Sequence, residues 1–493
     1  DRVGGAGIDT FTVDGAGSVM LGSQDFDGMD TLSGQGNDDV FNLGADFGGT
    51  INGDAGDDEF NLTASQTGLV DGGTDGANGD VINGVATENL FIVSSANGGT
   101  ANGTTFASVE NLTGGAAADE FRFEAGGSLG GSIDGAGGTD ELDVAGADAV
   151  TVNLGNSSAT VLNGGSADGF NSIETFTGNG TTDVLVGTGS GDTFNTTGVN
   201  DGTVAGVTYN DFANLSGGAG ADIFNLQHDV TGNVDGGDDA DTFNLTAGVA
   251  IGGSIIGGDG GNDDDELVAV GGAGPNTWNV TGDDAGTLNA QAFSDVENLT
   301  GNDNVDNFSF TGALTGTAAG LGNNDTFSVG NNGDDAGFFD GGSGSDSLSY
   351  AASTSGVTVD MAVIDGIESI TGSNSSDTFN LDGNEGNAIS IVGGGGTNDV
   401  VAVVGNTDIT GDLTVSDVDA VSLQADLSAD NIDLSVDGTI SQTAGQLAAQ
   451  SLVTSSVGGQ SFTDTAVSTF NATNTGSGNI ELLDNTGDLD ITG

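Results

Sequence analysis

Short segments of alternating hydrophobic and polar residues recur along the chain, and clusters of Gly and Asp separate them. Residues 50–52 and 59–62 alternate in this way, with Gly-Asp-Ala-Gly-Asp at 53–57 between them. Such segments with a period of two predict β-strands, and the Gly/Asp clusters predict turns that need positive φ. No window carries the 3.6-residue apolar stripe of a helix, so helical repeats are disfavoured.

Most of these units contain Asp-x-Phe or a close relative. Asp39 and Asp58 are 19 residues apart, and most other neighbouring pairs are separated by similar intervals. A unit of about 20 residues with two short strands is one coil of a β-solenoid. We therefore predict an all-β chain that forms a parallel, right-handed β-helix. A wider interval, such as the 41 residues from Asp265 to Asp306, predicts two coils of which one has lost the motif.

A longer repeat, marked by Val-Glu-Asn-Leu or a relative, is superimposed on the coils at 109–114, 212–217 and 296–301, with weaker copies at 29–32, 173–176 and 367–370. The copies at 212 and 296 start 84 residues apart, which corresponds to about four coils per module. The Asp-x-Phe motif ends near residue 405, although alternation continues. We therefore divide the chain into a Gly/Asp-rich solenoid at 1–404 and a continuing β-helix in a second sequence style at 405–493.

The charge of the chain is extreme, because 74 acidic residues face two arginines and no lysine, for a formal net charge of −72. Nucleic acids and anionic membrane surfaces are excluded as main partners, since they are bound through Lys and Arg. Divalent cations are the natural partners, although surface acidity can also serve solubility alone. The 93 glycines are typical of disorder, but many of the 24 Phe fall at one fixed repeat position, as expected for a stacked core.

The chain has no cysteine and a single proline, so the backbone ladder and the core must supply its stability. No run of 18 apolar residues is present, which predicts no membrane insertion. The first residues lack the basic and apolar regions of a signal peptide, so we expect a processed or excised piece of a longer chain.

Two segments, 217–225 and 341–349, match the nonapeptide Gly-Gly-x-Gly-x-Asp-x-U-x, in which U is a large hydrophobic residue. This pattern resembles the calcium-binding repeat of RTX exoproteins. The resemblance implies calcium at several turns, since Ca²⁺ takes six to eight oxygens from carboxylates and from carbonyls that a glycine-rich backbone can turn inward. The alternative is that Asp and Gly serve only as good turn formers. The candidate calcium ligands are Asp39, Asp58, Asp183, Asp192, Asp222, Asp241, Asp265, Asp325, Asp346 and Asp377.

The last 80 or so residues, with alternating segments at 431–434, 438–442, 447–452 and 478–482, look like filamentous-haemagglutinin exoproteins. That resemblance implies a right-handed parallel β-helix and a role in surface adhesion. Together the two resemblances suggest RTX-type repeats within a haemagglutinin-like exoprotein.

The function predicted from these patterns is that of a secreted structural or adhesive protein: a cell-surface stalk, a matrix component or a filament subunit. Its partners would be divalent cations, host or matrix surface ligands and, because no capping segment is visible at either end, further copies stacked end to end. The alternatives are a polysaccharide-active β-helix enzyme and a carbohydrate- or receptor-binding module.

The residues that such an enzyme or module would need are few and scattered, so we predict no enzymatic activity. We expect Arg122 in an ion pair between coils, His228 in a surface loop and Trp278 in the core. Asn residues at equivalent strand positions, such as Asn42 and Asn61, are expected to form an amide ladder.

Overall fold

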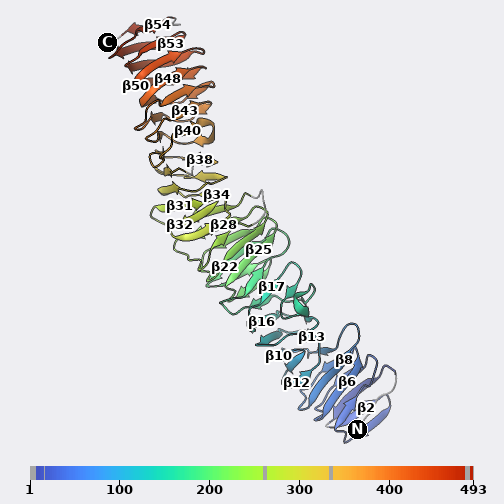
Figure 1. Cartoon of the computed structure of the whole chain (residues 1–493). Coiled ribbons are helices and arrows are strands. Elements are labelled where there is room, and N and C mark those ends of the chain that lie inside the picture. Colours follow the sequence, from blue (N-terminus) through green and yellow to red (C-terminus); the bar gives the residue numbers. More distant parts are fainter. Residues whose placement is uncertain (1–6, 16, 259–263, 332–336, 484–488, 492–493) are drawn as a thin grey trace. The chain divides into compact units, whose positions relative to one another are not determined.

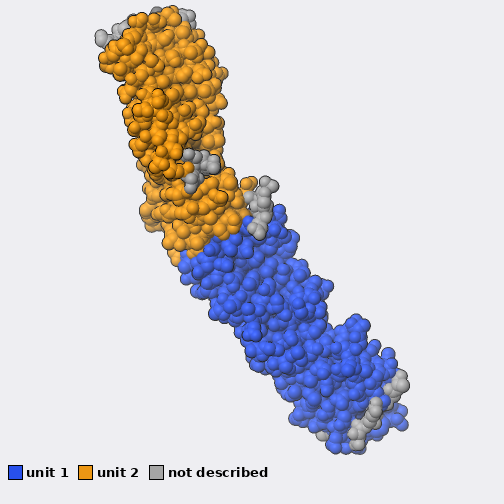
Figure 2. All heavy atoms as spheres, in the orientation of Figure 1, with its two compact units in different colours: residues 1–241, 249–261 blue, residues 242–248, 262–493 orange. Residues whose placement is uncertain are grey.

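A computed structural model of the chain describes residues 7–15, 17–258, 264–331, 337–483 and 489–491. The chain divides into two compact units, residues 1–241 with 249–261 and residues 242–248 with 262–493 (Figure 2). Both units consist of β-strands, and the helical residues among those described form two short 3-10 turns, η1 (Asn163–Gly165) and η2 (Met361–Val363). No helix in the described ranges is long and apolar enough to span a membrane.

Each unit is a parallel β-solenoid with about 21 residues per turn, as the sequence predicts. Figure 1 shows strands of successive coils stacked on one another within each unit. In unit 1, β5 (Val40–Leu43) pairs in parallel with β7 (Glu59–Leu62), and β6 (Thr50–Gly56) pairs with β8 (Leu69–Asp75). The register places Phe41 opposite Phe60, so the 19-residue step between Asp39 and Asp58 is one coil.

Equivalent residues of neighbouring coils stack in columns inside and outside the solenoid. The buried rings of Phe11, Phe41 and Phe60 are stacked nearly parallel, with centroids 4.8 and 4.9 Å apart. The predicted amide ladder is present beside this column, since Asn61 Nδ2 donates to Asn42 Oδ1 at 3.2 Å. A period-two strand therefore supplies a core residue and an outward polar residue to separate columns.

Three-stranded antiparallel meanders interrupt the parallel coils, and the sequence did not predict them. In unit 1 they comprise β1 (Thr10–Gly15), β2 (Ser18–Leu21) and β3 (Gln24–Asp27); β10 (Leu90–Ser95), β11 (Gly98–Ala101) and β12 (Thr104–Ala107); and β22 (Thr193–Gly198), β23 (Asp201–Val204) and β24 (Val207–Asn210). The second lies within a sheet, because β10 pairs in parallel with β14 (Glu120–Glu124) and β12 pairs in parallel with β8. A meander adds strands to one sheet, which lengthens the interval between equivalent coil positions.

The meander in unit 2 corrects the prediction made for the interval from Asp265 to Asp306. It consists of β31 (Asn276–Gly282), β32 (Ala285–Leu288) and β33 (Gln291–Ser294), where the sequence predicted a coil that had lost its motif. The chain leaves it through Asp295, which has a φ of 54°. The longer repeat follows directly, as it also follows the meanders of unit 1.

Beyond residue 405 the coils continue with longer strands, all within unit 2. They include β48 (Leu413–Leu423), β50 (Asn431–Gln442), β51 (Leu447–Ser456) and β53 (Thr465–Asn474). β48 pairs in parallel with β46 (Val400–Val403), so the same solenoid runs through the predicted change of sequence style. The division between the two compact units lies elsewhere, around residues 241–262.

Candidate metal centre

The ten aspartates proposed from sequence as calcium ligands are all buried at the corners where strands begin. Their exposure ranges from 0% to 8%: Asp39, Asp58, Asp183, Asp192, Asp222, Asp241, Asp265, Asp325, Asp346 and Asp377. They stand at equivalent positions of different coils and therefore form columns. We call each column a carboxylate ladder. Calcium binding by these ten residues stays a prediction.

Hydrogen bonds link consecutive members of a ladder through the backbone. The N–H of Asp39 donates to Oδ1 of Asp58 at 2.7 Å, and the N–H of Asp58 donates to Oδ1 of Asp80 at 2.7 Å. The same contact joins Asp222 to Asp241 at 2.6 Å. Each carboxylate thus satisfies a buried amide at the corner of the preceding coil, and a charged acceptor makes this hydrogen bond stronger than a neutral one.

A glycine five residues before the aspartate makes room for the other carboxylate oxygen. A Cβ on Gly53 would overlap Oδ2 of Asp58, and a Cβ on Gly217 would overlap Oδ2 of Asp222. Gly218 has a different task, since its φ of 100° requires glycine for conformational reasons. The paired glycines of the nonapeptide therefore provide close approach and a left-handed backbone, respectively.

The second oxygen has one of two environments. In Asp183 and Asp377 it accepts the N–H of the residue four positions earlier, Asn179 or Ser373, at 2.8 Å, which closes the turn. In other ladder residues Oδ2 is buried and finds no hydrogen-bond partner among the described residues: Asp39, Asp58, Asp80, Asp140, Asp222, Asp325 and Asp346. A buried oxygen of this kind needs a proton, a water or a cation.

Burial and neighbouring carboxylates shift the acid–base behaviour of the ladders. Burial, with the charges of adjacent acids, raises the pKa of Asp58 and of Asp222 to about 6 and that of Asp325 to about 7. The pKa of Asp183 is raised too, by burial alone, while hydrogen bonds oppose the shift. The ionised carboxylates of the ladders are therefore unfavourable in their buried surroundings, and either a proton or a cation at the unpartnered oxygens would relieve this.

Among the described residues, one group of three carboxylates comes close together, Asp75, Asp80 and Glu110 at the end of the first ladder. One oxygen of each lies within 4.8 Å of the others. Oε2 of Glu110 accepts the N–H of Asp80 at 3.0 Å, and its Oε1 accepts Nδ2 of Asn97 at 2.5 Å. Burial, together with the nearby carboxylates, raises the pKa of Asp80 and of Glu110 to about 7. Carboxylate oxygens are the ligands that hard cations such as Ca²⁺ take, so this donor set fits calcium.

None of these three residues was among the predicted ligands, although the sequence carries signals for two of them. Asp80 precedes the strand β9 (Val81–Asn83) as Asp58 precedes β7, but its hydrophobic residue is Ile82 where the motif has Phe. Glu110 belongs to the longer repeat, but this glutamate served only to recognise copies of the repeat and was not considered as a ligand. Neither signal reveals that a meander brings Glu110 next to Asp80.

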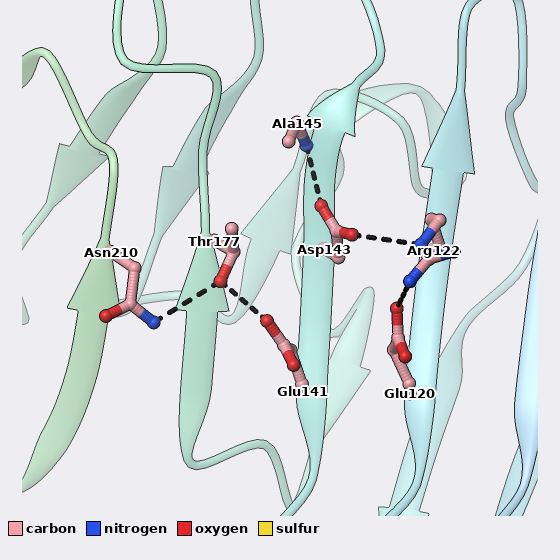
Figure 3. A network of polar contacts seen from close by, with 7 residues as sticks. All are labelled: Glu120, Arg122, Glu141, Asp143, Ala145, Thr177 and Asn210. Carbon is pink, nitrogen blue, oxygen red and sulfur yellow. Dashed lines mark hydrogen bonds and ion pairs between the residues drawn. The ribbon is translucent and has the colours of Figure 1, made fainter.

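Arg122 forms the expected ion pair between coils. From β14 its Nε donates to Oδ2 of Asp143 on β16 (Glu141–Gly146) at 3.1 Å, and its Nη2 contacts Glu120 on its own strand (Figure 3). Thr177 Oγ1 donates to Oε1 of Glu141 at 2.6 Å in the same network. The network lies on the outer face of the sheet, and its residues Glu120 and Glu141 directly follow the buried ladder residues Asp119 and Asp140.

Because the Arg122 side chain is 39% exposed, we expect Arg122→Gln to lower the free energy of unfolding by less than about 1 kcal/mol. Chemical denaturation at low salt and at 1 M salt checks this, and the difference should shrink in salt. A loss above about 2 kcal/mol at both salt concentrations would contradict it.

The aromatic residues that could contact a sugar lie in the core. Trp278 is 0% exposed, as predicted, and its Nε1 donates to Oδ1 of Asp306 at 3.0 Å. Tyr209 and Tyr350 are buried as well. His228 is exposed in a loop, as expected, where its Nδ1 lies 3.1 Å from the carbonyl oxygen of Thr196. None of these four residues belongs to the carboxylate group Asp75, Asp80 and Glu110 at the end of the first ladder.

The fold and the ladders define a repetitive β-solenoid with columns of buried carboxylates. No protein-family model matches the sequence, and no curated protein matches it. The resemblances to RTX exoproteins and to filamentous haemagglutinins therefore stay predictions from sequence.

Proposed function

We propose that the chain is an extracellular structural or adhesive repeat protein, such as a stalk, matrix component or filament subunit, which divalent cations stabilise. The observation that carries this proposal is the column of buried carboxylates with unpartnered oxygens, because only protons or cations can offset their mutual repulsion. The repetitive coils support a role in spacing or scaffolding. The charge of −72 supports an ion-rich setting outside the cell, where calcium is the hard cation we expect.

The same features guide the choice among partners and alternatives. Trp278, Tyr209 and Tyr350 lie in the core, which favours a structural role over a carbohydrate-binding module or a polysaccharide-active enzyme. Cations are the partners we propose first, followed by other copies stacked end to end and by host or matrix surfaces. The near-absence of basic residues leaves no means of holding nucleic acid.

A calcium titration of the EDTA-treated chain tests the proposal. We expect saturable binding of several ions and a rise in the melting temperature, with growth in light scattering if copies stack. Sodium at equal ionic strength is the control for charge screening, and magnesium tests the preference for calcium. An unchanged melting temperature with calcium would overturn cation stabilisation.

A further inference from the structure

We propose that carboxylate ladders end in cation sites, each built from the glutamate of the longer repeat and two aspartates of the preceding coil. The three sites are Asp75, Asp80 and Glu110; Asp134, Asp140 and Glu174; and Asp340, Asp346 and Glu368. This inference rests on the proposed stabilisation by cations, and it assigns the cations to the ends of the ladders. Of the ten aspartates proposed from sequence, only Asp346 belongs to one of these sites.

The first site holds more than a surface cluster of acids. Asp80 is 0% exposed, and its Oδ2 finds no hydrogen-bond partner among the described residues. Its Oδ1 accepts the N–H of Asp58 at 2.7 Å, and one of its carboxylate oxygens lies within 4.8 Å of an oxygen of Glu110 and of Asp75. Three carboxylate oxygens thus converge beside a buried acceptor that the protein itself leaves unused.

The same arrangement recurs at two other ladder ends. The N–H of Asp140 donates to Oε2 of Glu174 at 2.9 Å, and the N–H of Asp346 donates to Oε2 of Glu368 at 2.6 Å. Oδ2 of Asp140 and of Asp346 is buried and, among the described residues, unpartnered, as in Asp80. Because the same arrangement of acidic residues recurs at equivalent positions, a ligand common to the three sites explains it better than acidic residues that lie together by chance.

The outer members of the triads complete this equivalence. Asp134 and Asp340 each precede the buried aspartate by six residues, where Asp75 precedes Asp80 by five. The negative charge of Asp134 contributes to raising the pKa of Asp140, and that of Asp340 contributes to raising the pKa of Asp346, after burial as the main cause in both. The outer carboxylates therefore influence the buried ones electrostatically, but, among the described residues, their oxygens do not all lie within 4.8 Å of one another as those of the first triad do.

Chemistry favours a hard divalent cation at these sites. Each triad concentrates up to three negative charges around oxygen ligands, without nitrogen or sulfur donors from the same residues. Among the described residues, only the first triad brings three carboxylate oxygens within 4.8 Å. We therefore expect that triad to bind calcium most tightly and the other two more weakly.

The test compares calcium binding by the full chain and its variants by isothermal titration calorimetry. In the triple variant E110Q/E174Q/E368Q, the amide oxygen can still accept the N–H of the ladder aspartate, but one ligand charge is lost at each site. We expect the variant to lose three equivalents of calcium, and the calcium-induced rise in melting temperature to fall by more than half. The control E88Q/E124Q/E481Q removes the same charge from exposed glutamates and should bind as the wild type does.

A second variant, Asp75→Asn, guards against misfolding, because Asp75 is exposed and lies outside the ladder. It should remove the tightest equivalent while the metal-free melting temperature stays within about 2 °C of wild type. If the triple variant and Asp75→Asn both bind calcium as the wild type does, the assignment of these sites is wrong although cation stabilisation stands. If wild type itself does not respond to calcium, both proposals fail.

Discussion

Replacing Gly217 with alanine is expected to destabilise its coil by about 3 kcal/mol or more. A Cβ at this position would overlap Oδ2 of Asp222 and the carbonyl oxygen of Gly236, and would lie 2.7 Å from Cγ of Asp222. Neither neighbour can withdraw freely, because Asp222 holds the N–H of Asp192 at 2.5 Å and the carbonyl belongs to the adjacent coil. The added methyl group must therefore break the ladder or separate the coils.

Gly189→Ala is the matched control, because Gly189 also lies in a turn just before a ladder aspartate but has open space where a Cβ would stand. Its φ does not fall in the left-handed range, so alanine should change stability by no more than about 1 kcal/mol. Thermal melting and hydrogen exchange of both variants measure the difference. Equal stability of the two variants would show that the close approach of glycine to aspartate does not hold the coil together.

The coil itself could be predicted because its determinants are local. A strand such as 59–62 alternates inward Phe60 and Leu62 with outward Asn61. The Gly/Asp cluster at 53–57 was predicted as a turn, whereas β6 extends through residue 56 and the corner follows at 57–58. The same local pattern could not reveal the direction of the Asp58 side chain. A turn-forming aspartate and a buried one have the same sequence, and the amide that binds Asp58 belongs to another coil.

The meanders were missed for a related reason. The strand β12 alternates as parallel coil strands do, and the period of two does not distinguish the two kinds of pairing. The one distinguishing signal is Asn102-Gly103 between β11 and β12, where φ values of 49° and 82° form the tight hairpin turn typical of Asn-Gly. The Glu110 site depends on this meander, so it was missed with it.

The metal-free protein is expected to lose stability as the pH rises from about 4 to 8, contrary to an ordinary acidic protein with ion-paired carboxylates. The pKa of Asp222 in the folded chain is about 6 and that of Asp325 about 7, both raised from 3.8 chiefly by burial. Between pH 3.8 and these folded-state pKa values, the folded chain binds more protons than the unfolded chain. The resulting stabilisation is complete below pH 3.8 and is lost as the pH passes 6 to 7. Each unit of difference between the folded and unfolded pKa contributes about 1.4 kcal/mol to the free energy of unfolding.

Thermal melting in EDTA at pH values from 4.5 to 8 measures this slope. Hydrogen bonds from Thr67 lower the pKa of Asp46, which acts in the opposite sense, but this group lies near the surface and its effect is small. Asp222→Asn with Asp325→Asn should make the profile shallower, since an amide keeps the Oδ1 acceptor and does not titrate, while Asp58, Asp80 and Glu110 still contribute.

Asp30→Asn with Asp303→Asn, at two exposed positions, removes the same charge and should leave the slope unchanged. A melting temperature that is constant or rises toward pH 8 in EDTA would contradict the raised pKa values. Calcium should restore most of the loss at pH 8 and little at pH 4.5, because protons and cations compete for the same carboxylate oxygens. A pH-independent effect of calcium would place its sites away from the ladders.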